Sequence, residues 1–444
     1  MTSLQHNRTS QRGAVALTMA LLLLFGMTIV AFFANRGALF EQRASANQYR
    51  STVAFEAAEA GLEWFVARLN DPRKLGASPS CTTGTSTSAP DRFLPLTASG
   101  FTISSTLRTG CSLSSSGAPT CDCPSTGDPT LGAKDDPRFT VRVAAVAGDP
   151  WSVEVQSYGC SNAATTGGAC DPNTAGSDAI AVVSAIYKSK PSFPNSPGAG
   201  LVTGAVASAG GNLSVINTDV ASNGITINSG SAVELGTAVN VISLPGTPPR
   251  ASVLDNDSSL ANLNTTDPTG DLFFSTFFGE TLSQYQNNPQ TWTIQSAACG
   301  SNSQCSSCAN AGACATAMVS AIDAGFSKIW ASTDISVQGS DLTSLPNGTL
   351  GTATAPVAIA SNGNFKLTSN LTAYGLFYCQ SADVWDYTGS GTVQVNGAFV
   401  SRAAFSKGAG SLDLVYDANL FSPGKSRGVM IRVPGSWRDK SSFY

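Results

Sequence analysis

The sequence predicts an α+β protein. One long N-terminal helix packs on an antiparallel sheet, and a β-rich, solenoid-like region with a small helical insertion follows. Three observations lead to this prediction. Residues 14–34 carry no charge and continue without a proline to Asn70. Segments of alternating polar and apolar residues recur between residues 101 and 187. From about Gly198 onward the strand-like segments become short, and glycine and asparagine separate them.

The uncharged stretch from Ala14 to Ala34 is long enough to cross a membrane. At 1.5 Å per residue it would form a helix of roughly 30 Å, which matches the apolar core of a bilayer. A cleaved secretory signal has a shorter apolar region, of about 7–15 residues. A cleavage site near Phe33 and Ala34 is nevertheless one alternative, and an ordinary membrane anchor is another.

The helix is predicted to continue well beyond the membrane. From Asn35 to Asn70 there is no proline, and apolar or small residues recur at spacings of three and four between Phe40 and Phe65. The helix is expected to stop at residues 70–72, where a proline occurs. A rod of about 57 residues would be roughly 85 Å long. A simple anchor needs no such rod, whereas a subunit that packs helix against helix in a filament does.

The composition argues against enzymatic activity. Charged residues make up 12% of the chain, about half the usual share. The only histidine is His6, ahead of the apolar stretch, so a chain without this leader would have no imidazole for Ser/His or Cys/His catalysis. The formal net charge is −4 and no basic cluster occurs, which argues against nucleic acid as a partner.

The start of the chain resembles a known processing signal. The letters QRG at residues 11–13 precede a small residue and about twenty apolar ones, which is similar to the class III signal of type IV pilins and pseudopilins. The resemblance implies a leader of residues 1–13, cleavage between Gly13 and Ala14 by a prepilin peptidase, and methylation of the new N-terminus. The segment LFEQRASANQYRSTVAFEAAEAGLEW (residues 39–64) resembles the PilX-like minor pilins, which carry an E-x-R/K-x-A-x-N block followed by AFxAAEAGL.

Thr18 departs from the pattern of the major pilins, which carry Glu as the fifth mature residue. The resemblance implies that this carboxylate neutralises the N-terminal amine of a neighbouring subunit in the apolar filament core, where an unpaired charge is expensive. The first subunit of a filament has no neighbour ahead of it and loses nothing by lacking the carboxylate. Thr18 therefore suggests a position at or near the tip. The alternative is a tolerated membrane-helix residue whose hydroxyl bonds the preceding turn.

Beyond Pro72 the pattern changes to strands. Alternation predicts strands over Phe101–Leu107, Arg138–Val146, Trp151–Cys160 and Ala179–Tyr187. These strands would form a pilin-like antiparallel β head over residues 73–190, whose apolar face covers the exported half of the helix of residues 14–72. Residues 188–197 contain three prolines and are expected to form a linker.

Residues 198–444 are expected to form a β-solenoid-like C-terminal domain. Short β segments recur every 8–20 residues, with asparagine and glycine at the corners, which suggests a solenoid of β turns or a jelly-roll-like stack. The segments AYGLFY (residues 373–378), VYD (415–417) and PGSW (434–437) resemble the C-terminal domain attached to many longer PilX-like proteins. Helical spacing over Asp271–Tyr285 and Cys314–Trp330 predicts a helical insertion at about residues 270–330.

The eleven cysteines indicate disulfides, because the compartment implied by the leader is oxidising. Cys160 with Cys170 would close a short loop between neighbouring strands, and Cys111 with Cys121 or Cys123 would close another. A C-x5-C-x2-C-x5-C cluster favours two further structural disulfides over a zinc site or redox catalysis. Its members are Cys299, Cys305, Cys308 and Cys314. The odd count leaves at least one thiol unpaired or joined to another chain.

No cofactor, metal or catalytic site is predicted. Asp255-Asn256-Asp257 and Asp267 with Asp271 could offer oxygen ligands, but the calcium-loop pattern lacks its glycine and terminal glutamate. Solvated turn residues are therefore expected there. No P-loop or dinucleotide motif occurs. Three tryptophans could line a carbohydrate groove but are expected in the core; they are Trp292, Trp330 and Trp385.

The sequence therefore predicts a minor pilin of the type IV pilus. It would span a bacterial inner membrane once, with its C-terminal domain in the periplasm, and then enter a surface pilus at or near the tip. There it would prime assembly and present the C-terminal domain for adhesion or partner binding. The expected partners are other minor pilins, the major pilin and a PilY-type tip adhesin. The alternatives are a type II secretion tip pseudopilin and a membrane-anchored carbohydrate-binding β-solenoid protein.

Overall fold

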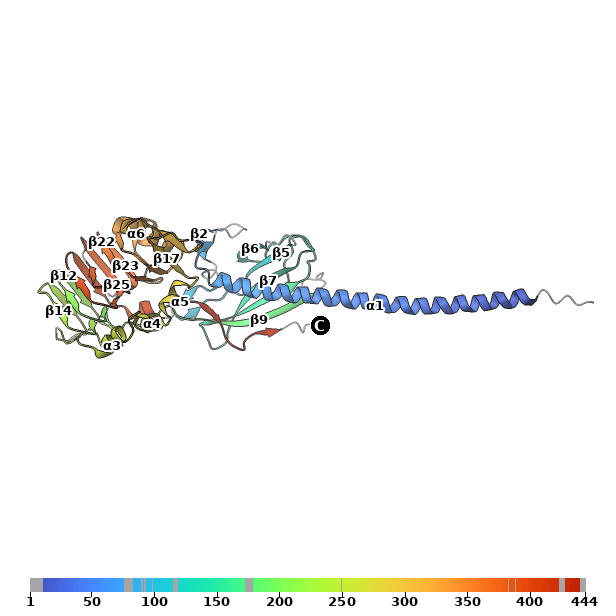
Figure 1. The fold of residues 1–444 in the computed structure, drawn as a ribbon, viewed down its shortest axis with the longest axis horizontal. Coiled ribbons are helices and arrows are strands. Elements are labelled where there is room, and N and C mark those ends of the chain that lie inside the picture. Colours follow the sequence, from blue (N-terminus) through green and yellow to red (C-terminus); the bar gives the residue numbers. More distant parts are fainter. Residues whose placement is uncertain are drawn as a thin grey trace, which may run out of the picture.

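The computed structural model describes residues 11–75, 83–88, 91, 93–97, 99–114, 119–171, 179–248, 250–381, 383–387, 389–422 and 428–439. Three parts follow one another along its length (Figure 1): a projecting helix, a β head packed on the second half of that helix, and a second β domain at the far end. The predicted α+β class is confirmed.

Helix α1 runs without interruption from Gln11 to Leu69. Every side chain from Val15 to Thr52 is exposed, and burial begins at Ala54. The helix ends where expected, because Pro72 follows two residues after Asn70 and cannot continue the turn. The apolar and small residues predicted at helical spacing between Phe40 and Phe65 therefore have two different surroundings. The first half of them projects from the molecule, and only the second half packs on the head.

The head is a seven-stranded antiparallel sheet in the order β6-β5-β7-β8-β9, with β28 and β29 both paired to β9. The strands are β5 (Leu107–Leu113), β6 (Pro119–Thr126), β7 (Arg138–Ala145), β8 (Ser152–Cys160), β9 (Ile180–Ser189), β28 (Met430–Arg432) and β29 (Arg438–Asp439). Two short pairs flank this sheet: β1 (Lys74–Leu75) with β2 (Thr83–Ser88), and β3 (Leu96–Thr97) with β4 (Gly100–Phe101).

The strands predicted from alternation are confirmed at β7, β8 and β9. The strand predicted over Phe101–Leu107 is wrong, because only its two ends are extended. Between them the Ser104 and Thr106 hydroxyls bond each other at 2.9 Å, and the Leu107 amide bonds the Ser104 carbonyl. Such local hydrogen bonds of Ser and Thr favour a turn over a strand.

The end of the chain returns to the head. Met430 pairs with Ser189 at the end of β9, so β28 and β29 complete a sheet begun more than 200 residues earlier. The far domain is thus an insertion between β9 and β28, and residues 430–439 belong to the head rather than to the C-terminal domain in which the sequence analysis placed them. The expected linker is packed rather than free, since Phe193 is buried against Phe421 with ring centroids 5.5 Å apart.

Asn70 fastens this returning strand to the end of α1. Its Nδ2 donates to the Met430 carbonyl at 3.1 Å, and its Oδ1 accepts from the Met430 amide at 2.7 Å. We expect Asn70→Ala to lower the local stability of β28 by about 1–3 kcal/mol, because it leaves two backbone groups without partners. Hydrogen exchange of residues 430–432 in the full chain checks this. Asn287→Ala is the control, since the Asn287 amide bonds only within its own turn. Unchanged exchange at Met430 would contradict the role given to Asn70.

The far domain is a parallel β-solenoid. Its largest sheet has twelve strands: β10 (Leu201–Thr203), β12 (Asn212–Ile216), β13 (Ile227–Ser229), β15 (Val239–Ile242), β16 (Val253–Leu254), β17 (Thr291–Gln295), β18 (Cys305–Ser307), β19 (Lys328–Ala331), β21 (Val357–Ser361), β23 (Leu371–Cys379), β25 (Thr392–Ser401) and β27 (Ser411–Val415). The four-stranded sheet holds β11 (Ala207–Ala209), β14 (Val233–Leu235), β24 (Trp385–Tyr387) and β26 (Phe405–Lys407), and β20 (Ile335–Gln338) pairs with β22 (Phe365–Thr368). Three 3-10 turns lie at Gly339–Ser344, Pro346–Gly348 and Ala418–Phe421.

The coils of the solenoid do not stack in chain order. The first coil, at Leu201, pairs with the last one, at Phe399. From there the chain winds outward to β16, crosses back through three helices, and starts again at β17 before winding towards the first coil. The crossing helices are α3 (Ser258–Thr266), α4 (Asp271–Phe278) and α5 (Leu282–Gln286).

The crossing helices are held by aromatic packing on the outer face of the solenoid. Phe274 is fully buried against Tyr378, with ring centroids 5.1 Å apart, and against Tyr285 at 5.3 Å. The predicted helical segment Asp271–Tyr285 is confirmed as α4 and α5, which break at the left-handed Gly279. The segment Cys314–Trp330 is only partly helical.

Helix α6 covers Ala311–Asp323, and the chain then turns at Gly325 into strand β19.

Stacked aromatic rings fill the solenoid. Trp385 lies 4.8 Å from Phe399, and neither is exposed. Trp330 is also buried, and Trp292 packs on Phe326 at 4.9 Å. Trp330 and Trp385 are therefore core residues and Trp292 is partly buried, so the three do not form the exposed row that a carbohydrate groove needs.

Candidate assembly site on the N-terminal helix

The projecting half of α1 is almost wholly apolar at its start. Among the described residues, α1 is the one helix that is long and apolar enough to cross a membrane. Large apolar side chains also stay exposed after the uncharged stretch: Leu39 is 55% exposed, Phe40 72% and Tyr49 71%. Lipid would cover Ala14–Ala34, but these three lie beyond it. A second protein surface is the natural cover for them.

The hydroxyl of Thr18 is used inside its own helix. It donates to the carbonyl of Val15 at 3.0 Å, and Thr28 donates in the same way to Leu24 at 2.9 Å. Such back-bonding satisfies a hydroxyl in an apolar medium. Because residue 18 is a threonine, this position has no carboxylate to offer to a neighbouring subunit, and its hydroxyl is already bonded within the helix. Gly13 and Ala14 lie in the first turns of α1, and leader residues 1–10 lie outside the described residues.

Small residues form the seat of α1 on the head. Ala54, Ala58 and Gly61 are buried and face strand β8. A methyl group on Gly159 of β8 would lie 2.1 Å from the Ala54 carbonyl oxygen and 2.3 Å from the Ala58 nitrogen. A methyl group on Gly61 would meet the Ser157 hydroxyl at 2.3 Å. Helix and sheet therefore touch backbone to backbone, which only glycine and alanine permit.

Phe55 and the glutamates of the same segment contact the returning chain end or face solvent. Phe55 meets Trp437 edge to face with ring centroids 6.4 Å apart. Glu63 lies 3.8 Å from Arg432, although both side chains are largely exposed and the pair adds little stability. Glu56 and Glu59 are exposed. The segment thus has one face that fits the head and an acidic face left open.

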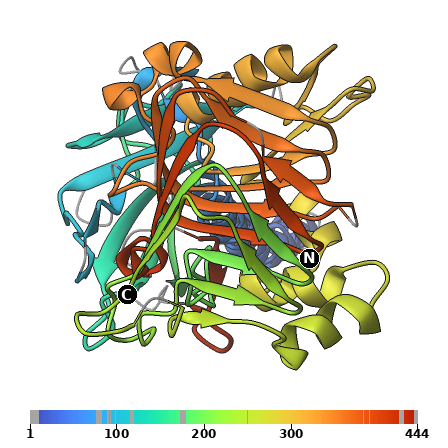
Figure 2. The same ribbon diagram turned by 90° about the vertical axis from the view of Figure 1, so that its left-hand side faces the viewer.

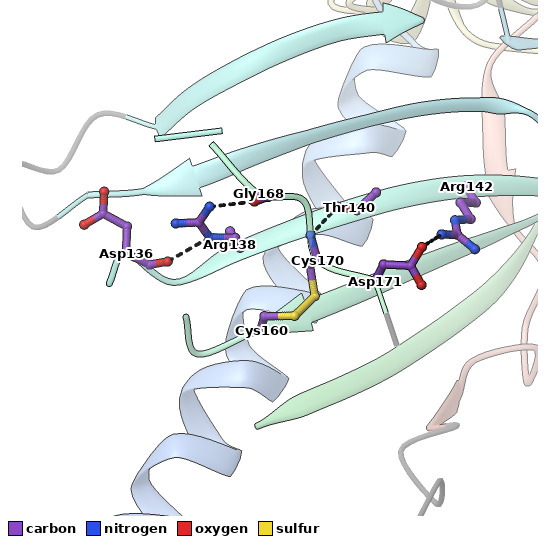
Figure 3. Close-up of a disulfide and its surroundings, with 8 residues drawn as sticks. All are labelled: Asp136, Arg138, Thr140, Arg142, Cys160, Gly168, Cys170 and Asp171. Atoms are coloured by element: carbon purple, nitrogen blue, oxygen red, sulfur yellow. Dashed lines mark hydrogen bonds and ion pairs between the residues drawn. A yellow bond between two sulfur atoms is a disulfide. The ribbon is translucent and has the colours of Figure 1, made fainter. Parts of the chain in front are cut away.

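On the side of the sheet away from α1, a disulfide pins a loop to the head (Figure 3). Cys160 at the end of β8 bonds Cys170, and the Cys170 amide donates to Thr140 at 3.0 Å. Arg138 is fully buried beneath this loop and donates to the Gly168 carbonyl at 2.7 Å. Burial lowers the pKa of the Arg138 guanidinium. The carbonyls of Ala133 and Asp136 also accept from this guanidinium.

Three more disulfides join cysteines singled out in the sequence. Cys111 bonds Cys121 on the neighbouring strand, Cys299 bonds Cys305, and Cys308 bonds Cys314. The four-cysteine cluster is thus two short-range disulfides. Cys123 is disulfide-bonded as well. Each bridge contributes about 2–4 kcal/mol by restricting the unfolded chain.

Cys379 is the one free cysteine among the described residues, and burial raises the pKa of its thiol to about 11. We expect no alkylation of Cys379 in the native protein at about pH 8.5, near the ordinary thiol pKa, and full alkylation after unfolding. Above the ordinary value and up to about 11 the folded state keeps a proton that the unfolded state releases, so stability falls as pH rises through this range. Mass spectrometry after iodoacetamide treatment checks the labelling, and native labelling would contradict the buried position.

Two of the aspartates considered as calcium ligands, Asp257 and Asp267, accept hydrogen bonds from backbone amides at the starts of helices instead. Asp257 accepts from the Ser259 amide at the start of α3. Asp267 accepts from the Thr269 hydroxyl and the Leu272 amide, and these hydrogen bonds lower its pKa to about 2. No group of three or more metal-binding side chains occurs among the described residues.

Comparison with known proteins places the helix in a family. Residues 12–63 match the family model described as PilX N-terminal. The match lies wholly within α1, so this helix is similar to the N-terminal segment of the PilX family. One solved structure that matches the chain is the competence-associated pilin ComZ from Thermus thermophilus, at 12% identity and a TM-score of 0.21, covering 88% of this chain and 98% of that one. A TM-score this low carries no argument about the fold. No curated protein matches the chain.

The PilX-like segment has two halves with different surroundings. The first block, Glu41–Asn47, is exposed throughout, whereas the second, Ala54–Leu62, contains the residues that fit the head. Sequence reasoning found the small residues of the second block but not their partner Gly159. It also missed Asn70 as the clamp on Met430. A glycine inside an alternating strand is the signal that could have pointed to a close backbone approach; nothing local points to the Asn70 contact.

Proposed function

We propose that this protein is a minor pilin that enters a type IV pilus at or near its tip and primes assembly there. The observation that carries the proposal is the division of α1. Its second half is locked into the head, while its first half projects with all side chains exposed from Val15 to Thr52. A helix held rigidly at one end and apolar at the other is suited to leave a bilayer and pack among like helices without refolding.

The shape of the molecule supports the tip position. The solenoid lies at the end opposite the projecting helix (Figure 1), and two chain connections join it to the head. In a filament of stacked subunits, a domain of this size at that end would collide with the subunit ahead. The first subunit has none. Thr18, which offers no carboxylate to a neighbour ahead, agrees with the same position.

The route to the tip begins in the inner membrane, with the head and solenoid in the periplasm. A prepilin peptidase would cut between Gly13 and Ala14, and the new amine would be methylated. Other minor pilins and the major pilin would then pack on the projecting helix. The solenoid would be presented outward for adhesion or for a PilY-type tip adhesin. No residue set among the described side chains supports catalysis.

Two measurements test this function. Intact mass of the membrane-extracted protein, with and without the peptidase in the cell, should give a chain starting at methylated Ala14 only when the peptidase is present. Immunogold labelling of sheared pili with an antibody to the solenoid should then mark filament ends. Labels spaced along the shaft would reject the tip position. A processed protein that never leaves the cell envelope would favour the secretion pseudopilin.

A matched variant tests the part played by residue 18. Thr18→Glu restores a carboxylate that could pair with the amine of a subunit ahead, so labels should begin to occur along the shaft. Thr28→Glu is the control, because it adds the same charge almost three helical turns further on, at another hydroxyl that bonds its own helix. Equal labelling by both variants would remove the argument from Thr18.

A further inference from the structure

The two ends of the solenoid differ in how they are covered. At one end helix α6 lies over β17 and β20 with Met318 and Val319 buried, and the Cys308–Cys314 disulfide ties it down. At the other end β14 and β15 each pair on one side only within the described residues. Figure 2, which faces the end of the molecule opposite the free end of α1, shows the α6 region and the coils of β10–β16 on opposite sides of the stack. A parallel solenoid normally needs a cap at both ends.

The uncapped coil leaves the core partly open. Its inward side chains Val233, Leu235 and Val239 are only half-buried. The residues paired with them in the next coil, Ala207, Ala209 and Leu213, are each at most 3% exposed. One more coil on top of β14 and β15 would complete the burial.

The backbone at this edge is also ready to pair. The Ile242 carbonyl bonds the Asn217 amide, and the Ala232 carbonyl bonds the Ala207 amide, so these residues point their backbone groups into the solenoid. Because backbone groups alternate along a strand, Val241, Val233 and Leu235 point theirs outward. Unpaired groups of this kind are a template for an added strand.

The charge of the solenoid indicates which charge an added strand would carry. Residues 198–422 contain fourteen acidic and five basic side chains, whereas residues 73–190 contain nine of each. None of the fourteen acids is buried. Three of the five bases, Lys328, Arg402 and Lys407, are buried, which leaves Arg250 and Lys366. The solenoid therefore presents a negative field, and Glu234 stands exposed in the middle of the open strand β14.

We propose that the open end of the solenoid, formed by β14 and β15, accepts as an added parallel rung an extended segment of another protein that carries basic residues on its outward side. Apolar residues of the segment would cover Val233 and Val239, and a cationic residue would lie beside Glu234. A second copy of this chain is disfavoured as the occupant, because it brings the same negative field. The proposal does not depend on tip placement.

The first test uses peptides and the full chain in nonionic detergent. A fluorescent peptide of alternating valine and lysine should bind, as measured by anisotropy, and binding should weaken as salt rises. The same peptide with glutamate in place of lysine should not bind, and neither should a lysine peptide with N-methylated valines, which cannot form backbone hydrogen bonds. No binding of the lysine peptide, or equal binding of all three, would overturn the proposal.

Variants locate the site. Val241→Pro removes an outward amide without breaking the ladder to β12 and should abolish binding, whereas Val241→Ala keeps the amide and should bind. Glu234→Gln should weaken binding by up to about fivefold, the upper range for a cross-strand charge pair. Asp386→Asn removes a charge from β24, at the opposite edge of the same sheet, and should leave binding unchanged. Binding that ignores Val241→Pro would place the peptide elsewhere. Concentration-dependent dimers abolished by Val241→Pro would show a second copy as the occupant instead.

Discussion

Replacing Gly159 by alanine is expected to disrupt the packing of α1 on the head. The added methyl would lie 2.1 Å from the Ala54 carbonyl oxygen and 2.3 Å from the Ala58 nitrogen, both backbone atoms of the helix. Neither can turn aside as a side chain could, so the whole helix must move away from β8. We expect a loss of about 3 kcal/mol or more, at or above the upper end of the usual overpacking cost of about 1–3 kcal/mol. Hydrogen exchange of residues 54–62 and 152–160 in the full chain measures it.

Two glycines of α1 serve as controls. Gly61→Ala places its methyl against side chains, the Ser157 hydroxyl and the Phe139 ring, which can adjust, so its loss should be smaller. Gly37 has nothing within 4 Å, and Gly37→Ala should stabilise the helix by about 0.5–1 kcal/mol in the absence of neighbours. If Gly159→Ala lost no more stability than Gly61→Ala, α1 and β8 would be able to move apart at little cost, which would contradict a rigid contact between them.

These positions illustrate what could be predicted from the sequence. Helix α1 and strands β7–β9 follow from periodicity within a few neighbouring residues, and the structure has them within three residues of the expected bounds. The pairing of Met430 with Ser189 joins segments about 240 residues apart, and that of Leu201 with Phe399 joins segments about 200 residues apart. No local pattern encodes such pairings, because any strand with the same alternation would satisfy them.

The candidate site shows the same limit. The spacing of apolar and small residues between Phe40 and Phe65 predicted one contact face of the helix, but which strand fits the part at Ala54 and Ala58 depends on Gly159, about 100 residues away. At position 18 the sequence alone established the missing carboxylate, and the structure adds that the hydroxyl is already satisfied by Val15. Its meaning for a filament depends on a neighbouring subunit and therefore stays a proposal.

The insertion of the solenoid into the head has a mechanical consequence. Both connections leave from paired residues, Ser189 at the end of β9 and Met430 at the start of β28. A pull on the solenoid therefore acts along β9, which is held by a nine-residue ladder to β8, and reaches α1 through Asn70. Further contacts cross the junction, including Lys74 with Asp323 at 3.4 Å. This arrangement couples the far domain to α1 more firmly than a single flexible linker would.

Gly397→Ala is expected to damage the solenoid as severely as Gly159→Ala damages the head. Gly397 and Gly375 are paired residues of β25 and β23, with φ of 133° and 150°. A methyl on Gly397 would lie 2.0 Å from the Gly375 carbonyl oxygen. Before this pair the strands alternate between buried and more accessible residues, and after it they are buried on both faces beneath the crossing helices. The glycines thus allow the bend that carries both strands under α4.

The expected loss is about 3 kcal/mol or more, because a strained backbone costs about 1–3 kcal/mol and the clash adds a similar amount. Gly127→Ala separates the two contributions. Its φ of 122° is similar, but nothing lies within 4 Å, so only the backbone strain remains. Hydrogen exchange of residues 371–379 and 392–401 should rise in Gly397→Ala while residues 138–160 stay protected, since the head and the solenoid have separate cores. If Gly397→Ala lost no more stability than Gly127→Ala, the paired strands would be able to move apart. The packing of α4 on Tyr378 would then not depend on the close contact of Gly375 and Gly397.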